Sequence, residues 1–183
     1  MTEDFKPDKD KIAKDRHEVL ERMNEELATA EVPAEILVSE AVENGPEILT
    51  VDLYQLGAAS DEVLGEFYFT PLATENDKVG YFNCVITLSE ELEQAYLGKL
   101  YEAVAVLDFH LMLGSFGVSA DGAFFSYKLT VPYALDMDKD TLFETVNIAT
   151  GNAIAVCDQW TDMMLRISEG KGDVEDVKSA FGM

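Results

Sequence analysis

Hydrophobic and polar positions follow two different periods along the chain, and together they predict an α+β protein. In residues 7–30, apolar side chains recur every three or four positions, which indicates an amphipathic helix with one apolar stripe. Residues 48–56, 63–70 and 79–88 alternate apolar and polar side chains instead, as strands with one buried face do. Because short loops join these three strands, they should form an antiparallel meander.

The segment between the first helix and the meander has no decisive period. Pro33 should end the helix, because proline disfavours a helical conformation at the residue before it. Residues 35–42 (EILVSEAV) suit either a strand or a short helical turn, and we expect a strand. The sequence Asn44-Gly45-Pro46 is a strong turn signal before the meander.

A long helix is predicted after the meander, in residues 90–112. Ser89 suits its N-cap, and Glu90 and Glu91 are favourable near the positive end of the helix dipole. One apolar stripe consists of Leu92, Tyr96, Leu100, Val104, Leu107 and Leu111. A second stripe consists of Leu97, Tyr101, Ala105 and Phe109. Two stripes require two packing partners: one face covers the sheet, and the other needs the final helix or a second copy of the chain.

The last third of the chain predicts a hairpin and another helix. Strands at 114–119 and 123–131 flank an Asp121-Gly122 turn, and Pro132 should end the second strand. Thr141 and Glu144 match a capping box that starts a helix at 141–168. Residues 173–183 suit either a frayed tail or a short docking helix through Val174, Val177 and Phe181, and we expect the tail.

These elements predict three parts: an N-terminal helix at 1–30, a single α+β domain at 31–170 and a C-terminal tail at 171–183. In the domain, a three-strand meander and a two-strand hairpin form an antiparallel sheet that packs against helices. A chain of 183 residues is long enough to build one hydrophobic core of this kind.

The net charge of −23 limits the classes of partner that the chain is expected to bind. The first 30 residues hold 9 acids and 6 bases, so most of the negative charge lies after residue 30. Such a chain repels phosphate backbones and anionic lipids, so we expect neither nucleic acid nor membrane as a partner. It favours polypeptides with basic and apolar side chains, although high charge also simply keeps proteins soluble. Without a spanning apolar run or a secretory signal, the protein is expected in the cytoplasm.

Candidate catalytic and metal-binding residues are few. Cys84 and Cys157 lie within apolar patterns, which favours buried side chains in a reducing compartment. A dyad of Cys84 and His110 has no local signature to support it. The acids of 136–140 resemble a calcium loop, but Thr141 and Asn147 stand where that loop needs glycine and glutamate. We therefore assign no catalytic, cofactor-binding or metal-binding residue.

One apolar cluster in the last predicted helix has two interpretations. Trp160, Met163 and Met164 could form an adaptable contact patch for a partner. Such residues fill the core side of helices more often, but we retain these three as the candidate partner-binding residues.

Three segments carry a resemblance to a known group of proteins: YFNCVITLSEEL, LGKLYEAVAVLDFHLMLGSFGVSADG and DQWTDMMLRISEG. With this order of elements, the chain resembles the YbjN-like group of bacterial proteins, which is similar in fold to type III secretion chaperones. The resemblance implies an acidic, non-enzymatic homodimer that holds a client polypeptide on apolar surfaces. It also implies that the helix after the meander forms the dimer contact, through Leu97, Tyr101, Ala105 and Phe109.

The function expected from the sequence is therefore a chaperone-like, protein-binding module without enzymatic activity or cofactors. The alternative is a regulatory or scaffolding protein of the sensory transduction regulator type, since fold alone does not fix function. A more remote alternative is an enzyme of unrecognised type, for which Cys84 and His110 are the only support.

Overall fold

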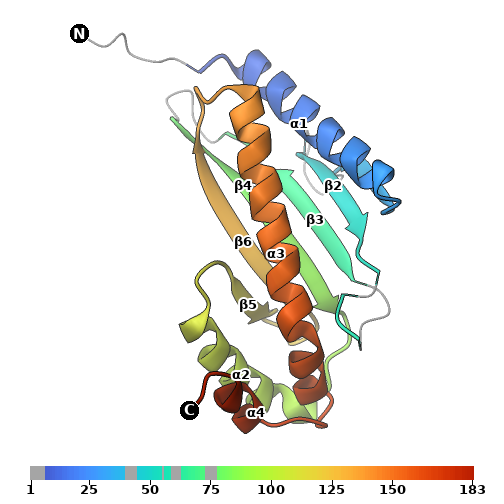
Figure 1. Ribbon diagram of the computed structural model, residues 1–183, viewed down its shortest axis with the longest axis vertical. Helices are drawn as coiled ribbons and strands as arrows, with labels where there is room; N and C mark the ends of the chain where they lie inside the picture. The colour runs from blue at the N-terminus through green and yellow to red at the C-terminus, as the bar shows by residue number, and fades with distance from the viewer. Residues whose placement is uncertain (1–6, 40–44, 55, 59–62, 73–77) are drawn as a thin grey trace, which may run out of the picture. The chain divides into compact units, whose positions relative to one another are not determined.

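The computed structural model describes residues 7–39, 45–54, 56–58, 63–72 and 78–183, which form four α-helices, one 3-10 turn and six strands (Figure 1). Their order is α1 (Lys9–Thr29), β1 (Ala34–Val38), β2 (Glu47–Asp52), β3 (Leu64–Phe69), β4 (Val79–Ser89), η1 (Gln94–Tyr96), α2 (Leu97–His110), β5 (Ser115–Val118), β6 (Phe125–Ala134), α3 (Lys139–Ser168) and α4 (Val174–Ala180). The strands form one antiparallel sheet in the order β1-β2-β3-β4-β6-β5. The predicted α+β class is confirmed.

The chain divides into two compact units, each assembled from three segments. Unit 1 comprises Met1–Val51, Glu66–Cys84 and Thr130–Gly151. Unit 2 comprises Asp52–Gly65, Val85–Leu129 and Asn152–Met183. The strands β2, β3, β4 and β6 and the helix α3 each contribute residues to both units. Neither unit follows the division at residues 30 and 170 that the sequence suggests.

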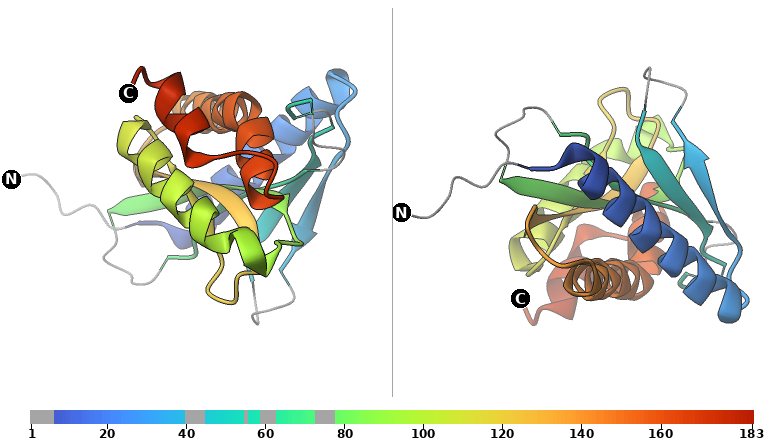
Figure 2. Two further views of the ribbon diagram at one scale, coloured as in Figure 1. Left: turned by 90° about the horizontal axis from the view of Figure 1, so that it is seen from below. Right: turned by 90° about the horizontal axis from the view of Figure 1, so that it is seen from above.

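In unit 1, α1 and the first half of α3 lie on the same face of the strands (Figure 2). The helix α1 begins after Asp8, whose side chain accepts a hydrogen bond from Lys11 N at 3.1 Å. It buries four residues of the predicted stripe, Ile12, Val19, Leu20 and Met23, and leaves the fifth, Leu27, half-buried. After α1, β1 pairs antiparallel with β2. The expected strand at 35–42 is thus confirmed as far as Val38, and residues 40–42 of that prediction lie outside the described residues.

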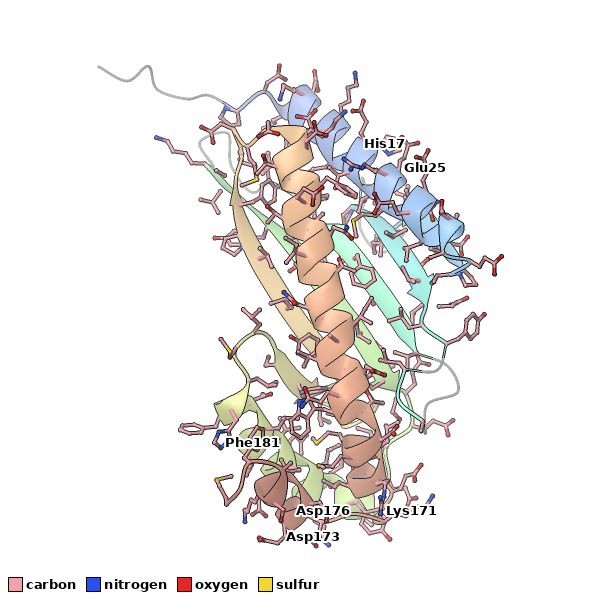
Figure 3. The ribbon with its side chains drawn as sticks, viewed as in Figure 1. His17, Glu25, Lys171, Asp173, Asp176 and Phe181 are labelled. Carbon is pink, nitrogen blue, oxygen red and sulfur yellow. The ribbon has the colours of Figure 1, made fainter. Side chains whose placement is uncertain are left out.

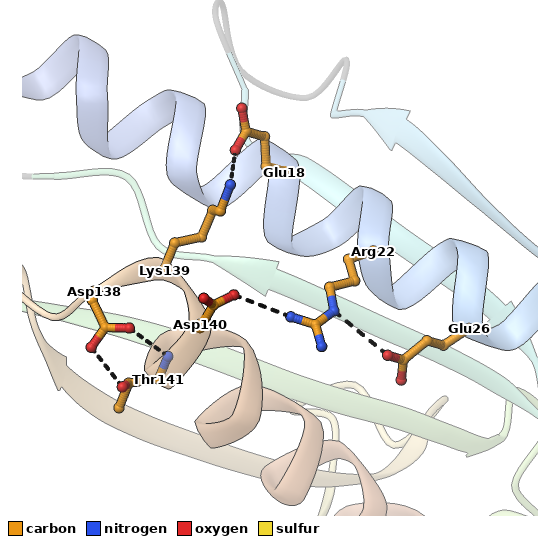
Figure 4. Close-up of polar contacts among 7 residues, drawn as sticks. All are labelled: Glu18, Arg22, Glu26, Asp138, Lys139, Asp140 and Thr141. Atoms are coloured by element: carbon orange, nitrogen blue, oxygen red, sulfur yellow. Dashed lines mark hydrogen bonds and ion pairs between the residues drawn. The ribbon is translucent and has the colours of Figure 1, made fainter.

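Polar contacts join α1 to the start of α3 in unit 1 (Figure 4). Lys139 pairs with Glu18, and Arg22 Nη1 lies 3.4 Å from Asp140 Oδ1. The predicted capping box is wrong, because Asp138 takes the capping role. Its carboxylate accepts hydrogen bonds from Thr141 N at 3.0 Å and Thr141 Oγ1 at 2.6 Å. A side chain placed just before the helix competes better for the free N–H groups of its first turn.

The alternation of the strands puts the predicted apolar faces in the core. Large side chains on these faces are buried: Leu49, Val51, Phe67, Phe69, Phe82, Ile86, Leu88, Phe125, Tyr127 and Leu129. The opposite face carries polar groups that can remain near water. In unit 1, for example, Asn83 donates to Thr70 Oγ1 at 2.8 Å and accepts from Thr130 Oγ1 at 2.9 Å.

β6 does not end at Pro132, as the sequence suggests, but continues to Ala134. Its pairing with β5 extends from Phe125, opposite Val118, to Lys128, opposite Ser115. Beyond Lys128 that side of β6 has no β5 partner, so a missing N–H interrupts no hydrogen bond to β5. Proline is tolerated at such unpaired strand edges.

In unit 2, α2 packs against α4 and β5. It begins at Leu97 rather than at residue 90, so the predicted start is wrong. Ser89 is the last residue of β4, and its hydroxyl is used in a local turn: it accepts from Glu91 N at 3.3 Å and donates to Glu91 O at 3.0 Å. The helix proper therefore starts only after the η1 turn.

The C-terminal segment forms a docked helix instead of the expected tail. Asp173 and Asp176 form a reciprocal capping box at the start of α4, and Val174 and Val177 are buried. The chain turns toward α4 at Gly170, which has a positive φ of 71°. A Cβ atom there would approach the ring of Tyr96 to 2.3 Å, so this turn requires glycine.

In the described part of the chain, none of the helices combines the length and the apolar character needed to cross a bilayer.

Candidate protein-binding surface

One side of α2 is left uncovered in unit 2 and is apolar. The opposite side packs inward through Leu100, Ala103 and Leu107, which are buried. Of the predicted dimer-contact residues, Tyr101, Ala105 and Phe109 are exposed, and Phe109 is 84% exposed. Leu97, the fourth of them, is half-buried and lies beside Gly122. The structure thus places three of the four predicted residues on one open helix face.

The open face continues past the end of the helix. Met112 is 96% exposed and Leu113 is also exposed. We call Tyr101, Ala105, Phe109, Met112 and Leu113 together the α2 row. Large apolar side chains scattered singly on a surface need no explanation, but several that follow one another along an element mark an interaction surface.

The helix α4 covers a neighbouring side of α2 through an aromatic stack. Phe181 lies beside the C-terminal end of α2 (Figure 3), stacked on the ring of His110 at 4.2 Å and on Trp160 at 5.2 Å between centroids. An ion pair between Lys99 Nζ and Asp173 Oδ2, at 2.9 Å, joins the same two helices. Thus α4 covers part of the second apolar side of α2, and the α2 row remains exposed.

The predicted partner patch in α3 is largely a core element. Trp160 is only 6% exposed and Met164 is fully buried, so the prediction that these two residues face a partner is wrong for this structure. Met163 is half-buried and lines a hollow of about 420 Å³ between α3 and α4, together with Asp162, Arg166 and Asp176. The spacing of the three residues is helical, and a helix stripe that meets a second element becomes core.

The suggested thiol nucleophile has an unfavourable environment. The Cys84 side chain is fully buried, and burial raises its pKa to about 12. At neutral pH it is therefore a protonated thiol, whereas a catalytic cysteine needs a thiolate that substrate can reach. Cys157 is also buried. His110 takes part in the aromatic stack with Phe181.

The acids near the start of α3 act as helix-capping and ion-pairing groups. Asp138 caps α3 and Asp140 pairs with Arg22. In the part of the chain that the structure describes, no three His, Cys, Asp or Glu side chains are grouped so that they could hold a metal ion.

A second surface feature of unit 2 combines apolar and acidic groups. A hollow of about 540 Å³ is lined by residues from the ends of β2, β3 and β4. Tyr54, which is 58% exposed, and Leu64 contribute apolar surface, and Asp52, Glu90 and Glu91 contribute carboxylates. We call this feature the acidic hollow. Its chemistry suits a side chain that has both an apolar stem and a positive charge.

Sequence patterns did not identify Met112 and Leu113 as surface residues. Both follow the last turn of a strongly apolar helix, and their position suggests continued packing. Gly114, which has a positive φ of 68°, follows both residues, so it does not signal that the helix ends before them.

Comparisons with known proteins give no family. No protein-family model matches the chain, and no curated protein matches it. A solved structure of an uncharacterized protein from Methanothermobacter thermautotrophicus is similar over 84% of this chain and 99% of that chain, with 16% identity and a TM-score of 0.40. Similarity at this level carries no argument about function.

Proposed function

We propose that this chain is a non-enzymatic, chaperone-like protein-binding module. It forms a homodimer through the α2 row and recognises a basic, apolar segment of a partner polypeptide at the acidic hollow. The resemblance to YbjN-like proteins and secretion chaperones supports the same function, with the helix after the meander at the dimer contact.

The observation that carries the proposal is the exposure of Phe109 and Met112, at 84% and 96%. Removing a side chain of this size from water contributes about 1.5–3 kcal/mol. A row-to-row contact across a two-fold axis would use each of these side chains twice, since the same patch on both copies meets itself. That gain offsets part of the cost of association.

Charge assigns different occupants to the two surfaces. Two copies of a chain with net charge −23 repel each other, so a contact between them has to be apolar, as the α2 row is. At the acidic hollow, the carboxylates of Asp52, Glu90 and Glu91 favour a partner with positive charge.

Light scattering on the purified chain tests the proposal. We expect a mass of twice the 20.2 kDa of one chain. Tyr101→Glu combined with Phe109→Glu should reduce it to one chain, because the carboxylates would be buried unpaired in the contact. The matched control is Ile148→Glu, which changes a 63% exposed apolar residue of α3 in unit 1. A native monomer, or a dimer that survives the double substitution, would contradict the proposal.

A further inference from the structure

Arg16 occupies an unusual position in unit 1. Its Nε donates to Tyr133 OH at 2.7 Å, and its Nη1 donates to Thr70 O at 3.0 Å. The guanidinium lies over the rings of Phe69 and Tyr133, at 5.2 and 5.8 Å from their centroids. A guanidinium has five N–H donors, and these two hydrogen bonds use only two of them.

The positive charge of Arg16 has no counterion among the described residues, although the chain has 36 acidic residues. Its Nη2 is buried and makes no hydrogen bond within the part of the chain that the structure describes. A buried donor without an acceptor is costly, and a charged one more so. An acceptor from outside the chain would remove that cost once the guanidinium turns to present this nitrogen to it.

Arg22, six residues further along the same helix, shows the ordinary arrangement. It also lies over an aromatic ring, 3.5 Å from the centroid of Phe143. Its charge is paired, with Glu26 at 3.6 Å and Asp140 at 3.4 Å (Figure 4). The lack of a carboxylate at Arg16 is therefore not a general feature of arginines on α1.

Arg16 also forms part of the wall of a hollow of about 510 Å³. The apolar part of the wall includes Leu20, Pro46, Phe69 and Pro71. Lys14 and His17 add further basic groups. Glu47 is the one carboxylate of the described lining, and both of its oxygens lie 3.0 Å from Nδ1 of His17. The lining of this hollow therefore carries more basic than acidic groups, unlike the strongly acidic chain as a whole.

We propose that this hollow in unit 1 binds the carboxylate of a small apolar acid, received by the unused N–H groups of Arg16, with the apolar group of the acid against Leu20 and Phe69. Arginine matches carboxylates better than any other side chain does, because its N–H groups form a planar fork. Carboxylates of this kind occur in free organic acids and at polypeptide C-termini that end in an apolar residue. Both sources present the same chemistry to Arg16.

The first experiment compares N-acetyl-leucine with its uncharged amide, N-acetyl-leucinamide, by amide chemical shifts of the full-length protein at constant ionic strength. We expect the acid to bind with a dissociation constant on the order of 1 mM, as a ligand of this size allows, and to shift residues of α1 and β3. The amide should cause no such shifts. Equal shifts with both compounds, or none with either, would overturn the proposal, because a water molecule alone would then satisfy Arg16.

Variants assign the effect to Arg16. Arg16→Gln should weaken binding of the acid by about tenfold or more, as loss of a charge-assisted hydrogen bond does. Arg22→Gln is the matched control and should leave the affinity unchanged. Lys14→Glu keeps the test decisive if Arg16→Gln does not fold, because Lys14 is 73% exposed and its charge reversal should weaken binding several-fold. Unchanged affinity in Lys14→Glu and in a folded Arg16→Gln would contradict the proposal.

A peptide arm then distinguishes the two sources. A short peptide that ends in leucine is compared with the same peptide amidated at its C-terminus. Shifts of the same α1 and β3 residues with the free carboxylate only would assign the hollow to polypeptide C-termini. Shifts with N-acetyl-leucine but not with this peptide would assign it to free organic acids.

Discussion

At the scale of single residues, strand faces could be predicted and helix faces only in part. Alternation placed Leu49, Phe67 and Phe82 correctly in the core, because a strand has only two faces and the apolar one is buried. A helix has several faces, so spacing shows which residues share a stripe but not what covers it. Trp160 and Phe109 both belong to apolar stripes, yet one is core and the other is in solvent.

Arg16 was not identifiable as a candidate from the sequence. It lies among charged residues on an amphipathic helix, where an arginine usually pairs with a carboxylate one turn away. Its hydrogen bonds reach Thr70 and Tyr133, which are 54 and 117 positions away in the chain. Only the fold brings these groups together.

His17 should make stability depend on pH. A hydrogen bond to Glu47, and in addition the charge of Glu21, raise the pKa of His17 above its ordinary value of 6.5. The folded state therefore holds this proton more tightly than the unfolded state. The resulting stabilisation is fully present below pH 6.5 and is lost as the pH rises through the folded-state pKa. Because the side chain is 44% exposed, we expect only a few tenths of a kcal/mol.

Urea unfolding of His17→Gln and the native protein at pH 5.5 and pH 9 measures this effect. At pH 5.5 the native protein should be more stable than His17→Gln, and this difference should shrink at pH 9. Glu47→Gln should remove most of the same pH-dependent part. If the difference in unfolding free energy between His17→Gln and the native protein is the same at both pH values, the pair of His17 and Glu47 contributes nothing to the pH dependence of stability.

At the scale of elements, the order and type of the long elements could be predicted and their ends could not. The predicted start of α2 was wrong, because Ser89 and the two glutamates after it look locally like a helix start. In the structure, β4 continues through Ser89. The helix α4 was considered but not preferred to a frayed tail, because a helix of seven residues is too short for a clear periodic signal. Its helical state depends on packing against α2.

The packing of α4 predicts a measurable contribution to stability. Val177 is fully buried in α4, so Val177→Ala should lower the free energy of unfolding by about 1–2 kcal/mol. Amide hydrogens of α4 should exchange faster in this variant. The control is Ser179→Ala, which changes an exposed residue of the same helix. If Val177→Ala is as harmless as this control, α4 is not docked as the structure shows.

At the scale of the whole molecule, the fold class followed from simple patterns, and the candidate surfaces followed from them only in part. The α+β class needed only the change of period from helix to strand and back. The two candidate surfaces of unit 2 depend on which apolar residues remain uncovered after α4 has docked, and on carboxylates from β2 and from the residues after β4 that meet at the acidic hollow. Both depend on contacts between distant parts of the chain.

The net charge predicts opposite salt dependence for the two surfaces. Salt should strengthen the proposed homodimer, because it screens the repulsion between two chains of charge −23. It should weaken binding of a fluorescent peptide of leucines and lysines to the acidic hollow. Glu90→Gln combined with Glu91→Gln should reduce peptide affinity by about 0.5–2 kcal/mol and flatten its salt dependence.

Fluorescence anisotropy of the peptide and light scattering of the protein, each over a range of ionic strength, give the two trends. Glu25→Gln combined with Glu144→Gln is the control, since it removes the same charge from exposed positions in unit 1. Equal losses of peptide affinity in the two double variants would mean that the peptide responds only to the total charge of the chain.

Photocrosslinking from position 109 tests the central claim, binding through the α2 row, most directly. Benzoylphenylalanine replaces Phe109 in one sample and Ile148 in a control sample, both exposed apolar positions. Each is prepared as a mixture of 14N and 15N chains and irradiated. We predict crosslinked products of mixed isotope composition that join position 109 to α2 of a second copy, and few from position 148. Mixed-isotope products no more abundant from position 109 than from position 148 would contradict the account.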